Sequence, residues 1–138
     1  MPTYERSFQC KVLTAEGERL AADAVSATFP AGDGMVGVLA RCGPLAATLG
    51  AGPLAVRKHD GTTARFFVVG GFVHVRNDVM TVLADECLPA DQVKAEQSRR
   101  QLDEALHMPA RSADAQAARD RAVRAARARL REATKPLH

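Results

Sequence analysis

Glycine and alanine divide this 138-residue chain at Pro89. All ten glycines lie before Pro89, whereas thirteen alanines lie from Ala90 onward. Glycine suits the turns between strands and weakens a helix, while alanine has the highest helix propensity. The sequence therefore predicts a β + α chain, with a β domain over residues 1–88 and a helical domain over residues 89–138.

The first domain alternates apolar and polar residues over short segments, which is typical of strands. The predicted strands are residues 7–13, 24–29, 37–40, 54–58, 64–69, 72–76 and 79–84. His59-Asp60-Gly61 and Arg76-Asn77-Asp78 are typical of hairpin turns. Gly70-Gly71 has no helix after it, which indicates a bulge or close backbone packing rather than a phosphate loop. Short strands at nearly even spacing favour an antiparallel β-sandwich or barrel.

The second domain has the residue spacing of two helices. Asp91 can cap the first helix, and Pro109 ends it because proline cannot continue a helix. Ser112 can cap the second, which is expected to run to about Thr134, and the short connection predicts an antiparallel hairpin. Its apolar face is mostly alanine, so it buries little area and can change position at a cost on the order of a few kcal/mol. The alternative is a solvated hairpin packed permanently on the sandwich.

The helical domain also carries the positive charge. Residues 1–89 hold eight Lys and Arg against nine Asp and Glu, whereas residues 90–138 hold eleven against seven. Five basic residues recur along one side of the second helix: Arg121, Arg124, Arg127, Arg131 and Lys135. An apolar line follows roughly the other side: Val123, Ala126, Leu130 and Ala133. A basic face of this kind is expected to meet an acidic partner.

The sequence offers no catalytic constellation, so a non-enzyme is predicted. Nucleophile-elbow, zinc-protease and phosphate-loop motifs are absent, and the four histidines are far apart. The three cysteines lack the paired spacing of a disulfide framework or zinc site, which indicates a reducing cytoplasm. No apolar run approaches the ~18 residues of a bilayer span, and the first ten residues lack the layout of a secretory signal.

The alternative function is a small nucleic-acid-binding module that uses the Arg-rich helix, because a basic face binds phosphates nonspecifically. That helix lacks the aromatic residues that stack on bases, so nucleic acid is not the expected partner. A third hypothesis is a small-molecule-binding sandwich enzyme. No cluster of acid, base and nucleophile in the sequence supports it.

Several segments, in order along the chain, resemble one family. They are Gly34-Met35-Val36-Gly37-Val38-Leu39 with Gly43-Pro44-Leu45, then Gly52, then residues 67–75 around Gly70-Gly71-Phe72, then residues 79–86. Their order, followed by a helical hairpin, is similar to the F-type ATP synthase epsilon subunit family. The resemblance covers nearly the whole chain. It implies a rotor-binding β-sandwich and a regulatory hairpin, in a non-catalytic subunit of a proton- or sodium-transporting complex.

The resemblance also implies that the sandwich contacts the gamma subunit and the ring of c subunits. The implied contact residues are Met35, Val36, Arg41, Cys42 and Pro44. Cys42 stands where the family has His and Met35 where it has an acidic residue, so the contact is expected to be more apolar, with a positive charge at Arg41. These departures indicate a divergent branch of the family, such as the enzyme of an alternate operon. The junction between Glu86 and Asp91 is shorter than is usual in the family, which is expected to restrict motion of the hairpin. The chain is expected to reach the cytoplasmic face of the bacterial inner membrane only through the complex, where it helps couple ion flow to ATP synthesis.

For the hairpin, the resemblance implies an extended position inside the alpha/beta hexamer that blocks ATP hydrolysis. The residues that would meet an acidic segment of the beta subunits are Arg121, Arg124, Arg127 and Arg131. Some family members bind ATP on the folded hairpin, and Asp91 and Lys94 match part of their motif, with Lys94 in place of Arg. The alternative is an ordinary helix cap and surface lysine. Weak regulatory ATP is the only small ligand implied, and no metal is expected. The coupled ion and the favoured hairpin position are left open.

Overall fold

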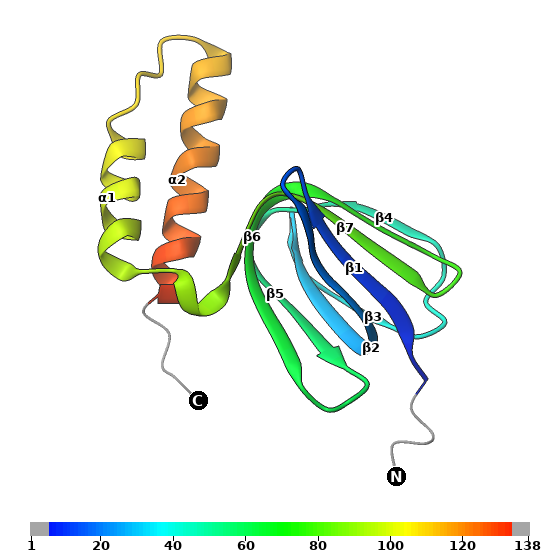
Figure 1. Ribbon diagram of the computed structural model, residues 1–138. Coiled ribbons are helices and arrows are strands. Elements are labelled where there is room, and N and C mark those ends of the chain that lie inside the picture. Colours follow the sequence, from blue (N-terminus) through cyan, green and yellow to red (C-terminus); the bar gives the residue numbers. More distant parts are fainter. Residues whose placement is uncertain (1–5, 134–138) are drawn as a thin grey trace.

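The computed structural model describes residues 6–133, which form a β-sandwich with a two-helix hairpin at its side (Figure 1). The predicted fold class is confirmed. The strands are β1 (Phe8–Thr14), β2 (Gly17–Ala31), β3 (Gly34–Leu39), β4 (Leu45–Thr48), β5 (Ala51–Lys58), β6 (Thr63–Arg76) and β7 (Val79–Pro89). After them come a 3₁₀ turn, η2 (Ala90–Gln92), and the helices α1 (Ala95–Leu106) and α2 (Ala113–Ala133).

Five of the strands close a circuit of hydrogen bonds in the order β1-β7-β6-β5-β2 and back to β1. β3 adds to this circuit beside β2, and β4 adds beside β6. All of these pairings are antiparallel except that of β1 with β7, which is parallel and differs from the all-antiparallel expectation. Closing the circuit pairs strand edges that would otherwise be open to other chains.

Two long strands change neighbours along their length. β2 pairs with β1 near its start and with β3 near its end, while β6 pairs first with β5 and then with β4. The sequence predicted only the second half of β2, because the first half is largely exposed and contains Glu, Arg and Ala. It missed β4 because the segment Leu-Ala-Ala-Thr has few strong strand formers.

Gly70 and Gly71 lie inside β6 and do not divide it, so the two strands predicted there are one. Their φ angles are 70° and 120°, in the region that favours glycine. The register with β7 is the same on both sides of the pair, with Val69 opposite Glu86 and Gly71 opposite Ala84, so there is no bulge. A Cβ on Gly71 would overlap the carbonyl oxygen of Leu83. Close backbone packing is therefore the reason for the glycine pair.

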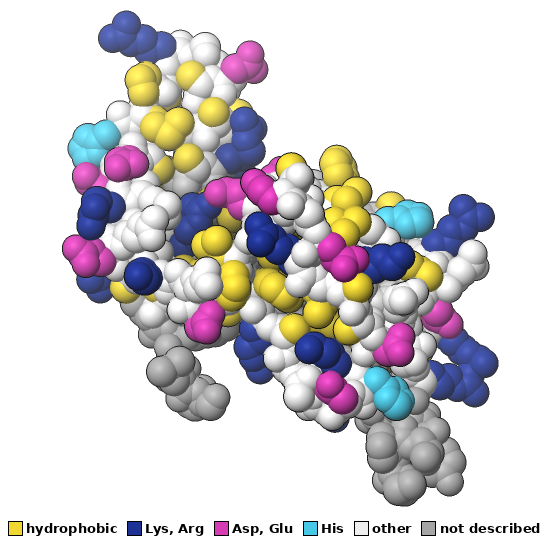
Figure 2. All heavy atoms as spheres, viewed as in Figure 1, with side chains coloured by type: hydrophobic (Ala, Val, Ile, Leu, Met, Phe, Trp, Pro, Cys, Tyr) yellow, Lys and Arg dark blue, Asp and Glu magenta, His cyan; other side chains and the backbone are white. Residues whose placement is uncertain are grey.

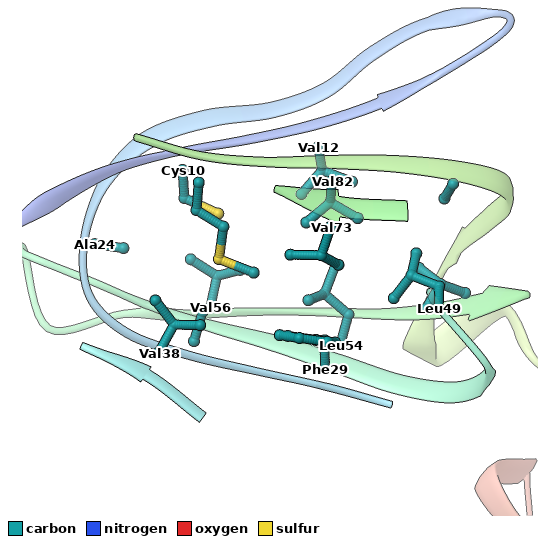
Figure 3. Packing of buried hydrophobic residues seen from close by; sticks show 14 of the residues in the cluster. Cys10, Val12, Ala24, Phe29, Val38, Leu49, Leu54, Val56, Val73 and Val82 are labelled. Carbon is teal, nitrogen blue, oxygen red and sulfur yellow. The ribbon is translucent and has the colours of Figure 1, made fainter. Parts of the chain in front are cut away.

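The core lies inside the sandwich and is built from small β-branched and aliphatic side chains (Figure 3). Phe29, Leu54 and Met80 are its largest fully buried members. They are surrounded by seven fully buried valines: Val12, Val38, Val56, Val68, Val73, Val75 and Val82. Each such side chain contributes roughly 1.5–3 kcal/mol on burial. A core without tryptophan is thus filled by interdigitating valines from facing strands.

The start of α1 differs from the prediction. Asp91 lies in η2 and caps nothing, and Lys94 occupies the N-cap position of α1 in an extended conformation without a side-chain cap. The physical reason is Val93, which is extended and buried beside Phe67 of β6, so the chain cannot enter the helix until after it. The predicted cap of α2 is confirmed, because the Ser112 hydroxyl accepts the N–H of Ala115 at 3.1 Å. The predicted end at Thr134 and the basic residue Lys135 lie outside the described residues.

The hairpin packs on the sandwich through α2, which contacts β5 and β6. The buried residues of α2 are Ala125, Ala126 and Ala128. A small second apolar cluster joins the two domains: Phe67, Val93 and Ala128, with Ala51, Val69 and Ala133 at its margin. The docked surface is therefore thin, as the alanine content predicts, and this docked arrangement of the hairpin is called its folded position below.

Candidate rotor-binding surface and hairpin junction

An exposed apolar pair lies on the outer face of the sandwich. Phe72 of β6 and Leu83 of β7 are directly opposite each other, and the two residues are 64% and 50% exposed. The same row continues to Leu13 of β1 on one side and Thr48 of β4 on the other. Figure 2 shows hydrophobic side chains gathered on this upper surface of the sandwich, in the region of β7. Two large apolar side chains side by side in water are typical of a docking surface.

Sequence reasoning did not select this pair. In the sequence, Phe72 belongs to the Gly-Gly-Phe strand motif and Leu83 to the closing strand, and neither position is marked as a contact. The available signal was the alternation itself: Val73 and Val75 are buried, so Phe72 must point outward with His74. An aromatic residue on the solvent side of an alternating strand is the feature to look for.

The loop between β3 and β4 carries three of the predicted contact residues, Arg41, Cys42 and Pro44. Arg41 adopts a left-handed backbone conformation with φ of 63°, and its N–H donates to the carboxylate of Asp78 at 2.6 Å. Cys42 is half-buried against the core, while Arg41 and Pro44 are exposed. The loop is thus fixed to the β6–β7 turn by Asp78, which the sequence placed in a hairpin turn without indicating this contact.

The structure does not bring the five predicted contact residues together. Met35 and Val36 lie near the start of β3, and the loop of Arg41 follows its end, about 20 Å away at strand spacing. Met35 is 54% exposed, whereas Val36 packs partly against the core. Met35 also lines a hollow with Ala128 and Arg131 of α2. The two groups therefore lie at opposite ends of β3.

An ion pair between Arg129 and Glu86 joins α2 to the sandwich. The guanidinium of Arg129 donates to the carboxylate of Glu86 at 3.0 Å, and the Arg129 side chain is only 15% exposed. The same guanidinium lies over the Phe67 ring, 6.0 Å from its centre. A cation over an aromatic face adds to the attraction. Arg129 was not among the predicted site residues, because Glu86 lies 43 positions away and no local spacing reveals the pair.

The four arginines that were predicted to contact the beta subunits, Arg121, Arg124, Arg127 and Arg131, are exposed. In the folded position they line a groove between α2 and the sandwich. Arg119, by contrast, donates to the carbonyl of Leu106 and ties α2 to the end of α1. The structure thus brings the four arginines together along one side of α2.

A cavity of about 430 Å³ lies between β7, the start of α1 and Arg129. Lys94 lines it, whereas Asp91 is exposed and lies outside its lining, so the structure places only one of the two predicted ATP contacts there. Three acidic residues, Glu16, Asp85 and Glu86, balance three basic ones, Arg19, Lys94 and Arg129.

The three cysteines are free thiols. Burial raises the pKa of the Cys10 thiol to about 12. Burial also raises the pKa of Cys87, and the positive charge of Arg19 partly opposes that shift. Within residues 6–133, no group of three or more His, Cys, Asp or Glu is placed to hold a metal ion. No helix in this range is long and apolar enough to cross a membrane.

Residues 7–90 match the family described as ATP synthase, Delta/Epsilon chain, beta-sandwich domain. The chain belongs to this family. The ATP synthase epsilon chain of Rhodopirellula baltica is 36% identical over 125 residues, which span 91% of this chain and 97% of that one. The epsilon chain of Chromohalobacter salexigens is 33% identical over 103 residues, or 72% of this chain and 73% of the relative. The resemblance to the epsilon family inferred from the sequence motifs is confirmed.

Two solved structures share this fold at lower sequence identity. A chain from the Tetrahymena thermophila mitochondrial ATP synthase central stalk and c-ring superimposes with a TM-score of 0.77 at 15% identity, covering 94% of this chain and 98% of that chain. A chain from the Euglena gracilis mitochondrial ATP synthase also gives a TM-score of 0.77, at 20% identity, covering 88% and 78%. At these identities the likeness shows the fold alone.

Proposed function

We propose that this chain is the central-stalk epsilon subunit of an F-type ATP synthase, where it helps couple ion movement to ATP synthesis and restrains ATP hydrolysis. The observation that supports this most is that the structure consists of two parts with different surfaces. A self-contained sandwich core carries an exposed apolar pair, and a basic hairpin is docked on it through a thin surface. The subunit itself is non-catalytic, and it reaches the cytoplasmic face of the membrane only through the complex.

The gamma subunit is the proposed partner of the Phe72–Leu83 surface. An exposed aromatic beside an aliphatic residue gives a central apolar anchor of the kind that dominates interface energies. The Arg41–Pro44 loop and Met35, at the two ends of β3, are proposed to contact gamma and the c-ring separately, because they are too far apart for one small patch.

The hairpin is proposed to leave the sandwich and place Arg121, Arg124, Arg127 and Arg131 against an acidic segment of the beta subunits. Leaving requires loss of the small Phe67–Val93–Ala128 cluster and of the Arg129–Glu86 pair. The buried alanines of α2 bring little apolar area to this contact, so the cost of release is modest.

Weak regulatory ATP at Asp91 and Lys94 is proposed as a ligand of the folded position, and titration calorimetry with ATP on the full chain and on Lys94→Gln tests it.

Two pairs of full-length variants test the main proposal with matched controls. Phe72→Ser/Leu83→Ser should abolish co-elution with gamma, whereas Leu106→Ser/Met108→Ser, which removes exposed apolar residues from the hairpin, should leave it unchanged. Arg124→Gln/Arg127→Gln should raise ATP hydrolysis by the reassembled enzyme, whereas Arg99→Gln/Arg111→Gln should not. Unchanged co-elution in the first case, or unchanged hydrolysis in the second, would contradict the corresponding half of the proposal.

A further inference from the structure

β3 is an edge strand of the sandwich. Within residues 6–133 it pairs with β2 along one side, and no strand pairs with its other side. Sheet edges are usually protected by a charged side chain, a proline or a bulge. The segment Gly34–Leu39 has neither charge nor proline, and its register with β2 is regular. The free side of β3 is therefore open to another strand.

Pro30 of β2 shows which backbone groups face the free side. It lies opposite Met35, and it has no N–H to donate. Its carbonyl accepts the N–H of Gly50 at 2.8 Å, toward β5 rather than toward β3. Hydrogen-bonded and non-bonded residue pairs alternate along an antiparallel ladder. The backbone groups of Met35, Gly37 and Leu39 therefore point away from β2, toward the free side.

The side chains of β3 are arranged so that the strand fits a copy of itself. Val38 points into the core (Figure 3), whereas Met35 and Leu39 are 54% and 64% exposed, on either side of Gly37. An antiparallel copy centred on Gly37 places Met35 opposite Leu39 of that copy, so two exposed apolar side chains meet twice. In the described chain, nothing lies within 4 Å of a Cβ added to Gly37, so the centre of the pair is clear.

The charges beside β3 fit the same register. Asp33 comes four residues before Gly37 and Arg41 four residues after it. In the antiparallel pair, each of these residues lies beside the opposite charge of the other copy. Both are exposed, and neither side chain forms an ion pair within the described residues. A two-fold axis at Gly37 repeats the contact at both ends, as a symmetric dimer requires.

We infer that the free chain forms a symmetric dimer in which the β3 strands of two copies pair antiparallel about Gly37. The new hydrogen bonds join Gly37 to Gly37 of the second copy, and Met35 to its Leu39. The Leu39 carbonyl already accepts the N–H of Cys42 at 3.2 Å, but a carbonyl oxygen can accept two such bonds. The short strand predicts a small interface and a micromolar dissociation constant.

Met35 and Arg41 are also proposed rotor contacts, so the dimer is the form of the chain outside the complex. The inference needs only the sandwich and does not depend on the proposed function. A chain that stays monomeric but still co-elutes with gamma would contradict the dimer and leave the proposed function standing.

Sedimentation velocity of the full chain, from about 1 to about 200 µM, tests for the dimer. We expect a reversible monomer–dimer equilibrium that weakens as salt rises, because the contacts at the two ends are ionic. Gly37→Pro should raise the dissociation constant about tenfold or more, because it removes an N–H from the free side of an edge strand and none from the ladder with β2. Phe72→Ser/Leu83→Ser removes exposed apolar residues from another face and should change the constant less than about twofold.

Charge reversal tests the register. Asp33→Lys and Arg41→Glu should each weaken the dimer about fivefold, because each places like charges together at both ends of the pair. The combined variant Asp33→Lys/Arg41→Glu should return to within about twofold of the parent constant, because opposite charges face each other again. Arg76→Glu makes the same change of charge as Arg41→Glu at an exposed position outside β3, and it should leave the dimer unchanged.

The inference is wrong if the chain stays monomeric at about 200 µM, or if the combined charge variant dimerises no more tightly than the single ones. It is equally wrong if a folded Gly37→Pro variant dimerises like the parent chain, or if Phe72→Ser/Leu83→Ser abolishes the dimer. Circular dichroism checks the fold of each variant, and the charge variants decide the question if Gly37→Pro does not fold.

Discussion

The carboxylate of Asp78 accepts the backbone N–H of Arg41 at 2.6 Å, across 37 positions of sequence. Asp78 belongs to the tight turn between β6 and β7, where both Asn77 and Asp78 have positive φ angles. Its own carbonyl accepts the N–H of Gln9 at the start of β1. One turn residue therefore fixes both the beginning of the sheet and the loop proposed to face the rotor.

Replacing Asp78 by glycine should loosen that loop. Glycine accepts the left-handed conformation, with φ of 58°, so Asp78→Gly removes the acceptor without adding backbone strain. We expect a loss of about 1 kcal/mol in the free energy of unfolding, measured by urea denaturation, and weaker binding to gamma. Asn77→Gly is the matched control, because Asn77 has the same backbone conformation and its side chain makes no hydrogen bond within the described residues. Equal effects in both variants would show that the Arg41 contact is unimportant.

Gly71→Ala should be among the most damaging small substitutions in the chain. The new methyl group would meet the carbonyl oxygen of Leu83 on β7, and the φ of 120° is unfavourable for any residue with a Cβ. The expected loss in the free energy of unfolding is about 2 kcal/mol or more. Gly37→Ala provides the comparison, since nothing lies within 4 Å of its added Cβ. If both variants unfold at the same urea concentration, the close packing of β6 on β7 at Gly71 does not determine the stability of the sandwich.

How much of this fold follows from sequence depends on the range of the interactions. Alternation, turn residues and helix caps act within a few positions, so the class of each domain, the hairpin turns and the Ser112 cap were predictable. The parallel pairing of β1 with β7 and the continuity of β6 depend on partners far along the chain. The start of α1 was mispredicted for the same reason, because burial of Val93 beside Phe67 overrides a local cap signal at Asp91.

The candidate site shows the same difference between local features, which the sequence predicts, and contacts between distant residues, which it does not. A basic side on α2 follows from arginine spacing alone, and the structure confirms that these side chains lie together. The ion pair of Arg129 with Glu86, the anchoring of Arg41 by Asp78 and the facing of Phe72 with Leu83 each join residues from different elements. No local spacing encodes such contacts, so they could be found only once the strand register was known.

Arg129→Gln should weaken docking of the hairpin. The substitution removes the ion pair with Glu86 and the contact over the Phe67 ring, and the buried position of Arg129 makes the loss larger than for an exposed pair. We expect a cost of about 1 kcal/mol, seen as faster amide hydrogen exchange throughout α2 while exchange in β5 and β6 stays slow. Arg99→Gln on α1 should leave exchange unchanged, because Arg99 is exposed and makes no ion pair within the described residues. Unaltered exchange in Arg129→Gln would show that the apolar cluster alone holds α2.

Ala128→Leu tests that apolar cluster directly. Ala128 is buried beside Phe67 and Val93, so a larger side chain must push α2 away or distort β6. Overpacking of this kind costs about 1–3 kcal/mol. Because the docked surface is thin, α2 should separate from the sandwich before the sandwich itself unfolds. Cleavage of the hairpin by a protease should therefore become faster, while the unfolding transition of the sandwich should stay unchanged. Ala117→Leu, at an exposed position of the same helix, should leave both measurements as they are in the parent chain.

The raised pKa of the buried Cys10 thiol predicts that the free energy of unfolding falls at alkaline pH. An unfolded thiol ionises near pH 9.0, whereas burial holds the pKa of Cys10 at about 12 in the folded chain. Because the folded pKa is the higher one, this contribution is fully present below pH 9 and is lost as pH rises from 9 toward 12. Urea denaturation at pH 7, 9 and 10.5 should therefore show a falling free energy of unfolding, and Cys10→Ala, although less stable at pH 7, should fall less steeply.

Iodoacetamide at pH 8 should modify half-buried Cys42 well before Cys10 or Cys87, and early labelling of Cys10 would contradict its place in the core.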